Sequence, residues 1–441
     1  MAGDADRSEP RSVLIVCYGF PDIGNDGVIR TYQLAKHLRS FGWQPIILTA
    51  QPCPSGYEED IEASDGPLDC PRVTVAPSRI LVPFRSDSQG YSSSPDRPTP
   101  QFNGLSARLV RFASRFAVPD GKLGWCAAAA RRGLRIGREH RIRSCLSVSP
   151  RPTSHLVARR IARSLGIPWV ADFALPWSDA YWLSGRPRFI EKLDRKLEGM
   201  VVRSADHITV AYANIARGLC ARHGAGSEKR ISIVPTGFAD ELFAQEPATR
   251  RAKFTITYPG HHFGEAGRYG ECFLKAADEW IAEDSRLADQ VEYVFIGKRD
   301  EDLVRQRAAM AHPEVVRLEP LVSHRACVRA ILASHVCLVN AVGNRIPVKV
   351  YECMRAGKPI LALTEPGSDL ERLMGRYAGG VAVPARDISA IRNALRRLWQ
   401  TRDATPPEPM EAASPLKQYS SEQSARIVSR ILDGLVHSRN G

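Results

Sequence analysis

Lys349 and Glu352 are the two charged residues whose types and spacing best suit a chemical role. They stand three positions apart near the start of a predicted helix, so their side chains share one face. A nucleotide-sugar site needs a carboxylate to accept hydrogen bonds from ribose hydroxyls, and cations or backbone N–H groups to neutralise a departing diphosphate. This pair could supply one of each. The alternative is an ordinary solvated pair on an amphipathic helix.

A glycine-containing loop follows the first predicted strand and leads into a helix. Gly19, Gly24 and Gly27 lie in this loop, where backbone N–H groups and a helix N-terminus could approach an anionic ligand. The glycines lack the GxGxxG spacing and no GKS or GKT follows, which disfavours NAD, FAD and Walker-type ATP binding. The alternative is a plain strand-to-helix turn that needs glycine for its backbone dihedral angles.

The overall charge narrows the classes of partner. The chain has 441 residues, of which 61 are Lys or Arg and 48 are Asp or Glu, giving a net charge of +13. An anionic substrate, a nucleic acid or an anionic membrane surface could each account for this excess. The sequence contains no RNA-binding signature, zinc-finger spacing or basic–aromatic run, so we expect no nucleic-acid partner.

Cysteine usage and hydropathy predict a cytoplasmic location. The ten cysteines lie singly, without a CxxC pair, and are expected to be reduced. The first eleven residues lack the apolar segment of a signal peptide, and no window has the roughly 20 apolar residues of a membrane span.

Short β-branched runs alternate with helix-length segments along the chain, which predicts the α/β class with parallel sheets. After residue 243 the composition turns polar and a second series of strands begins. The predicted strands are 12–17, 45–50, 73–77, 144–148, 169–173, 207–211 and 231–235, then 254–259, 291–297, 315–318, 336–340, 359–363 and 380–383. The predicted organisation is a disordered N-terminus over 1–11, a first domain over 12–243, a linker over 244–253, a second domain over 254–416 and a C-terminal helical segment over 417–441.

The segment PVKVYECMRAGKPILAL resembles the signature of GT4-type glycosyltransferases, which combines Pro-x-Lys-x-x-Glu, a helix end of small residues, Gly-x-Pro and a strand. The N-terminal GFPDIGNDGVIRTYQLAKHL is similar to the opening loop and first helix of that family. Further similar segments follow in the family's order at 119–125, 149–173, 201–210 and 231–243. The resemblance implies a GT-B architecture, in which two Rossmann-like domains with parallel sheets face each other across a cleft and the C-terminal helix crosses back to the first domain.

The same resemblance implies an activity. A sugar would move from a UDP- or GDP-linked donor to an acceptor hydroxyl with retention of anomeric configuration, in glycan, glycolipid or glycosylated-metabolite biosynthesis. The acceptor could be a sugar, a lipid-linked molecule or a small molecule. No cofactor and no metal are expected, because the sequence has no DxD-like motif after a strand and GT-B enzymes generally stabilise the leaving diphosphate with cationic side chains and backbone donors.

On the donor side, the resemblance carries over residue by residue. Glu352 matches the glutamate expected on the ribose and Lys349 the lysine near the diphosphate, while Arg268 is a weaker candidate for a phosphate-binding arginine. Asn344 stands eight residues before Glu352, where many relatives have a second glutamate that contacts the donor sugar. The other expected donor-binding residues are Gly24, Gly27, Gly260, Gly264, Gly367 and Ser368.

On the acceptor side, Asp172 and Trp177 match a motif that is Asp-Phe-Arg-Asp-Pro-Trp in many relatives. Here Ala174 and Leu175 replace the Arg and the second Asp, which removes two charged groups. His155 is expected at a helix start that faces the cleft, where it could have a catalytic role. The alternative is an ordinary histidine at a helix end.

Two other functions stay open. An inverting transferase or a nucleotide-sugar epimerase would need a general base, for which His155 is the first-domain candidate. A binding or scaffold protein that kept the fold without catalysis is favoured by Asn344, Ala174 and Leu175.

The segment 105–116 could bring the acceptor side to an anionic membrane. Its leucines and phenylalanines recur at helical spacing and three arginines supply positive charge. A first-domain helix whose apolar face is simply buried is the alternative.

Overall fold

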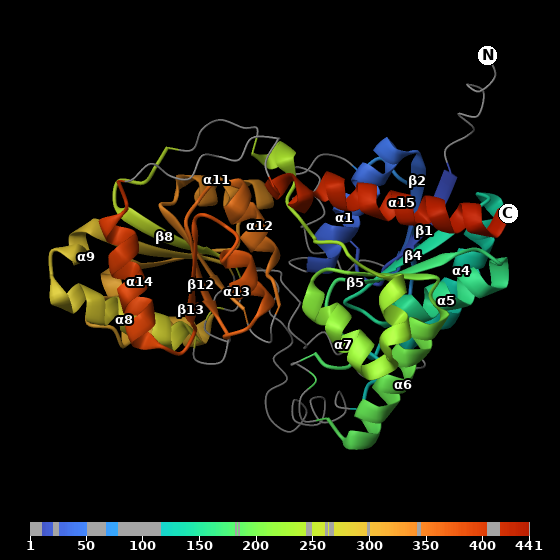
Figure 1. Ribbon diagram of the computed structural model, residues 1–441, viewed down its shortest axis with the longest axis horizontal. Coiled ribbons are helices and arrows are strands. Elements are labelled where there is room, and N and C mark those ends of the chain that lie inside the picture. Colours follow the sequence, from blue (N-terminus) through green and yellow to red (C-terminus); the bar gives the residue numbers. More distant parts are fainter. Residues whose placement is uncertain are drawn as a thin grey trace, which may run out of the picture. The chain divides into compact units, whose positions relative to one another are not determined.

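The computed structural model contains two compact α/β units (Figure 1). It describes residues 11–20, 26–50, 68–77, 116–180, 183, 186–243, 249–260, 263, 269–297, 300–341, 345–403 and 415–440. The first unit holds the described residues up to Thr236 together with the last helix, and the second runs from Gly237 to Ser420. Among the described residues, no helix combines the length and the apolar character needed to cross a membrane.

The first unit is built on a seven-stranded parallel sheet with the order β3-β2-β1-β4-β5-β6-β7. The strands are β1 (Arg11–Val16), β2 (Trp43–Ala50), β3 (Arg72–Val75), β4 (Ser144–Val148), β5 (Trp169–Phe173), β6 (His207–Val210) and β7 (Ile231–Ile233). The helices are α1 (Asp26–Leu38), α4 (Leu123–Glu139), α5 (Thr153–Leu165), α6 (Arg188–Ser204), α7 (Ala213–His223) and α15 (Ser421–Asn440). The strand order reverses between β1 and β4, and ligands of open α/β sheets bind outside the carboxyl ends of strands at such a reversal.

The second unit repeats this construction with a six-stranded parallel sheet in the order β10-β9-β8-β11-β12-β13. The strands are β8 (Phe254–Pro259), β9 (Val291–Ile296), β10 (Val316–Glu319), β11 (Val336–Asn340), β12 (Ile360–Thr364) and β13 (Gly380–Pro384). The helices are α8 (Tyr269–Glu283), α9 (Leu287–Gln290), α10 (Glu301–Ala308), α11 (His324–Ala333), α12 (Val348–Arg355), α13 (Asp369–Met374) and α14 (Ile388–Gln400). Here the reversal lies between β8 and β11.

Each strand expected from the sequence is present, and β4, β5, β8, β11 and β12 are buried along their whole length, whereas the edge strands β3 and β7 are partly exposed. Parallel strands covered by helices on both sides are continuous apolar runs, and residues 13–16 of β1 are all fully buried. The second core is aromatic, with Phe263 packed against the rings of Tyr258, Phe273 and Phe295. The predicted α/β class with two Rossmann-like, parallel-sheet domains is confirmed.

The last helix, α15, belongs to the first unit. It lies beside α1 (Figure 1). Its Asp433 accepts a hydrogen bond from Trp43 Nε1 at 2.9 Å and pairs with Arg11 at 2.8 Å. Arg439, near its end, pairs with Asp206 at 2.9 Å. The chain therefore leaves the first unit after β7, builds the second and returns.

The division between the units lies earlier than the sequence suggested. The predicted first domain extended to residue 243, but the second unit begins at Gly237. The physical reason is that Phe238 belongs to a hydrophobic cluster of the second unit's core, and Asp240 pairs with Arg355 at 2.6 Å. The composition of the sequence indicates the polar run after residue 243, but it gives no sign of these tertiary contacts.

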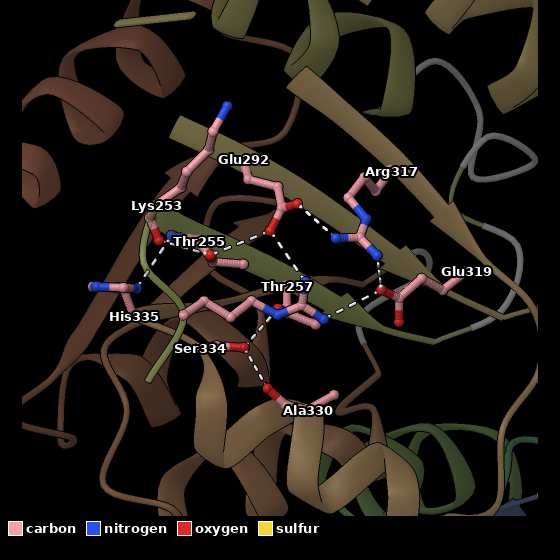
Figure 2. A network of polar contacts seen from close by, with 10 residues as sticks. Lys253, Thr255, Thr257, Glu292, Arg317, Glu319, Ala330, Ser334 and His335 are labelled. Atoms are coloured by element: carbon pink, nitrogen blue, oxygen red, sulfur yellow. Dashed lines mark hydrogen bonds and ion pairs between the residues drawn. The ribbon is translucent and has the colours of Figure 1, made fainter. Parts of the chain in front are cut away.

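A polar network joins the strands of the second unit (Figure 2). Glu292 pairs with Arg251 and Arg317 at 3.1 Å each, and Glu319 pairs with the same two arginines at 3.2 Å each. The four charges alternate and so offset one another. This network ties the segment before β8 to β9 and β10, and we assign it a structural role.

Candidate active site

Glu352 is the centre of a buried charge cluster in the second unit. Its Oε1 lies 2.8 Å from His324 Nε2 and its Oε2 lies 2.8 Å from Lys349 Nζ. Lys349 and Glu352 come from α12, which begins directly after Pro347. His324 is the first residue of α11, whose N-cap Ser323 accepts a hydrogen bond from the Ala326 N–H. Two helix starts thus bring one carboxylate and two basic side chains together.

The charges of this cluster are set by opposing effects. Burial by itself would raise the pKa of Glu352, but Lys349 and His324 outweigh it and lower the pKa to about 2. Glu352 is therefore ionised at neutral pH. Its side chain is only 2% exposed, whereas that of Lys349 is 24% exposed, so Lys349 is the member that solvent reaches most readily.

Sequence reasoning missed His324. A serine followed by a histidine at a predicted helix start places His324 in the first turn of α11. This local pattern does not indicate which residue His324 contacts. Glu352 is 28 residues further along the chain, and only packing brings the two together.

The predicted donor turn at Gly367 and Ser368 is closed by its own hydrogen bonds. Gly367 has a φ of +74°, which favours glycine. Its N–H donates to Glu371 Oε2 at 2.6 Å, and the Ser368 N–H donates to the Glu365 carbonyl at 3.2 Å. Ser368 Oγ accepts from the Glu371 N–H at 3.1 Å and so caps α13. The backbone groups expected to face a donor are thus already bonded within the turn.

The other predicted donor residues are only partly described. Gly260 follows β8 and donates its N–H to the Ile296 carbonyl at 3.1 Å. A Cβ there would lie 3.2 Å from the Tyr258 ring, so the position suits glycine. Gly27 lies in the first turn of α1. Gly24, Gly264, Arg268 and Asn344 lie outside the described residues.

Asp172, expected on the acceptor side, is buried within the first unit. It lies in β5 with no exposed surface. Arg30 donates to both of its carboxylate oxygens at 2.7 Å, and the Thr209 hydroxyl donates as well. Both partners of this ion pair are inside the core, where the pair links α1 to the sheet.

Trp177, the second residue expected on the acceptor side, is also buried, at 3% exposed. Its Nε1 lies 3.4 Å from Asp194 of α6. The next residue, Ser178, donates its N–H and its hydroxyl to Glu198 of the same helix at 3.0 and 2.8 Å. The loop after β5 is therefore fastened to α6 by two buried carboxylates.

His155, which the sequence places at a helix start that faces the cleft, is fully buried. Its Nδ1 lies 2.8 Å from Ser147 Oγ, and its ring centroid is 4.7 Å from that of Phe173. Burial lowers the pKa of His155 to about 4, although Asp172 and Glu198 act against this. The imidazole is therefore neutral at pH 7. Its Nε2 has no hydrogen-bond partner in the part of the chain that the structure describes.

The predicted membrane segment, 105–116, lies outside the described residues except for Phe116. Phe116 itself is 41% exposed.

Two Rossmann-like units with parallel sheets are the arrangement of the GT-B fold, and the second unit holds a Lys–Glu pair at the start of α12. The comparisons with known families agree. Residues 27–237 match the family described as glycosyl transferase 4-like domain, and residues 260–401 match glycosyl transferases group 1. The chain belongs to the GT4-type glycosyltransferases of the GT-B fold, as the sequence resemblance indicated.

Solved structures of low sequence identity share this fold. Sucrose-phosphate synthase from Thermosynechococcus elongatus is 14% identical and has a TM-score of 0.67, with 97% of this chain and 100% of that chain covered. A protein assigned as a UDP-N-acetylglucosamine 2-epimerase from Listeria monocytogenes is 13% identical with a TM-score of 0.54, covering 96% and 95%. The S. aureus MnaA–UDP co-structure is 14% identical with a TM-score of 0.55, covering 96% of each chain. A search of curated protein sequences found no match.

Proposed function

We propose that the protein transfers a sugar, most simply a hexose, from a UDP- or GDP-linked donor to an acceptor hydroxyl with retention of anomeric configuration. The observation that carries the proposal is the ionised carboxylate of Glu352, held between His324 and Lys349. A carboxylate has about four acceptor positions, of which these two contacts use two. The others could accept the ribose hydroxyls of a nucleotide.

Lys349 would supply the positive charge for the leaving diphosphate. Its Nζ is fixed by Glu352 at 2.8 Å and its side chain is partly exposed, so the ammonium group is oriented before a ligand arrives. Fixed charges that meet the charge developing in a transition state are a large source of catalysis. Arg268 is proposed to assist Lys349, and no metal is proposed.

The remaining donor contacts are proposed for Gly24, Gly27, Gly260, Gly264 and Asn344. Gly367 and Ser368 fit this role only with a rearrangement, because Glu371 and Glu365 hold their N–H groups. A donor phosphate would displace the Glu371 carboxylate from Gly367. In the first unit, Asp172 and Trp177 are proposed to support the acceptor side from within rather than to contact the acceptor.

The test is a panel of UDP and GDP sugars incubated with the purified protein, followed by measurement of transfer or slow donor hydrolysis.

Lys349→Ala and Glu352→Gln should each weaken donor binding or turnover at least tenfold, because each removes a charge-assisted contact of about 1.5–3 kcal/mol. His324→Ala should weaken donor binding less, since it acts through Glu352. Arg329→Ala, an exposed position on the same helix α11, is the matched control. If Lys349→Ala and Glu352→Gln both keep wild-type kinetics, these residues do not form the donor site. A product of inverted anomeric configuration would contradict retention.

One observation favours a scaffold protein that kept the fold and lost catalysis. Ala174 and Leu175 are buried at 2% and 3% exposure where many relatives carry charged residues. Calorimetry with UDP and GDP tests this alternative, because a scaffold need bind neither. Epimerase activity, the other alternative, would appear in the donor panel as conversion of the nucleotide sugar without an acceptor.

A further inference from the structure

Helix α6 buries Ile190, Val201 and Val202 as an ordinary surface helix would, but four of its other residues depart from that pattern. Phe189 and Leu193, one turn apart, are 62% and 44% exposed, whereas Asp194 and Glu198 are buried at 1% and 0%. A helix on a globular protein normally turns its apolar stripe inward and its charges outward. Here two carboxylates lie inside and two large apolar side chains lie in solvent.

The inward carboxylates fix the rotation of the helix. Asp194 pairs with Arg186, which also donates to the Ala117 carbonyl. Glu198 pairs with Arg222 at 2.9 Å and with His223 at 2.8 Å, in addition to its two bonds from Ser178. Turning Phe189 and Leu193 inward would break these buried ion pairs, so the apolar residues stay on the outer face.

The exposed apolar surface extends beyond the helix. The ring of Phe116 lies 6.2 Å from that of Phe189, and Arg186 holds the segment next to Phe116 against α6 through the Ala117 carbonyl. We call Phe116, Phe189 and Leu193 the apolar patch. It combines two aromatic rings and one leucine from two segments of the first unit.

Basic residues surround the apolar patch. Lys192 and Lys196 follow Phe189 at positions i+3 and i+7 of the helix, which places them on the same outer face. Arg188 and Arg195 flank this face, and all four side chains are exposed. The carboxylates of Asp194 and Glu198 point inward, so they do not neutralise this surface at short range.

We propose that this face of α6 docks the protein on an anionic lipid bilayer, with the apolar patch at the headgroup boundary and the four basic residues on lipid phosphates. Interleaved lysine and aromatic side chains suit this interface, since the rings enter the acyl boundary while the ammonium groups stay at the headgroups. A second copy of the chain fits less well, because a symmetric contact would bring two positive surfaces together. The proposal is independent of the transfer reaction.

The experiment is sedimentation of the full chain with vesicles of phosphatidylcholine alone or with 30 mol% phosphatidylglycerol, an amount chosen on the order of a natural anionic leaflet. We expect binding to the anionic vesicles that weakens at high salt. Two variants test the two components: Phe189→Ser with Leu193→Ser, and Lys192→Glu with Lys196→Glu. Because each basic residue near an anionic surface contributes roughly 1 kcal/mol, the charge variant should bind at least about tenfold more weakly.

Matched controls keep the result specific. Lys275→Glu with Arg329→Glu, both exposed in the second unit, changes the net charge equally and should bind like the wild type. Leu318→Ser, 37% exposed in the second unit, controls for the loss of a surface apolar residue. Circular dichroism and melting curves confirm that each variant is folded.

Three results would overturn the proposal. The first is no binding to anionic vesicles at low salt. The second is an equal loss of binding in the α6 variants and their controls, which indicates net charge alone. The third is a concentration-dependent dimer, seen without vesicles, that the serine variant abolishes, which identifies a second copy as the occupant.

Discussion

At the scale of single residues, buried titratable groups make the free energy of unfolding depend on pH, and the histidine and the glutamates act over different pH ranges. Burial lowers the pKa of His155 to about 4, so between pH 6.5 and 4 the unfolded chain binds a proton that the folded chain does not. Stability therefore falls as the pH falls through this window. Glu198 and Glu352, whose pKa values are lowered to about 2, contribute stability that is present above about pH 4.5 and is lost below it.

We predict that the wild type loses about 2 kcal/mol of unfolding free energy through His155 between pH 7 and pH 5. His155→Gln cannot take up this proton, so its loss over the same interval should be smaller by about that amount. Urea unfolding at both pH values measures the difference, with circular dichroism at pH 7 to establish that the variant folds. Equal losses in the two proteins would mean that His155 accepts its proton equally well in the folded and unfolded states.

At the scale of elements, α15 is a structural part of the first unit although the second unit precedes it in the chain. Its buried face contains Ala425, Val428 and Leu432, all with no exposed surface. The interaction of Asp433 with Trp43 and Arg11 adds polar contacts at the edge of that face.

Leu432→Ala should therefore lower the unfolding free energy by about 2–5 kcal/mol, the usual cost of a cavity at a buried leucine. Arg430→Ala, an exposed position on the same helix, should stay within about 0.5 kcal/mol of the wild type. Thermal unfolding of the three proteins is the measurement. Equal melting curves for both variants would show that α15 contributes little to the first unit.

At the scale of the whole molecule, the two units have separate cores, and the candidate nucleotide site and α15 lie in different units. A ligand that binds only the folded state raises the stability of the unit that holds it. UDP or GDP should thus raise the melting temperature of the second unit, whereas Leu432→Ala should lower that of the first. Differential scanning calorimetry of the wild type and the variant, each with and without nucleotide, separates these shifts. A single transition that moves in both cases would mean that the two units unfold together.

The sequence by itself determined the features that depend on neighbouring residues. Alternating β-branched runs and helix-length segments predicted every strand of both sheets, and the central strands are continuous apolar runs because a parallel sheet covered by helices buries them on both faces. The proximity of Lys349 and Glu352 also followed from helix geometry, which places residues i and i+3 on one face.

Only the tertiary structure decided which residues meet over long distances in the chain. Glu352 meets His324 because α11 and α12 begin near each other, and Asp172 is buried because Arg30, 142 residues away, pairs with it. The same holds for α6, where local periodicity gave no sign that Asp194 and Glu198 lie inside while Phe189 and Leu193 lie outside. Burial and ion pairing of this kind depend on partners from other elements, and a single sequence fixes the spacing of residues within an element but not the element that packs against it.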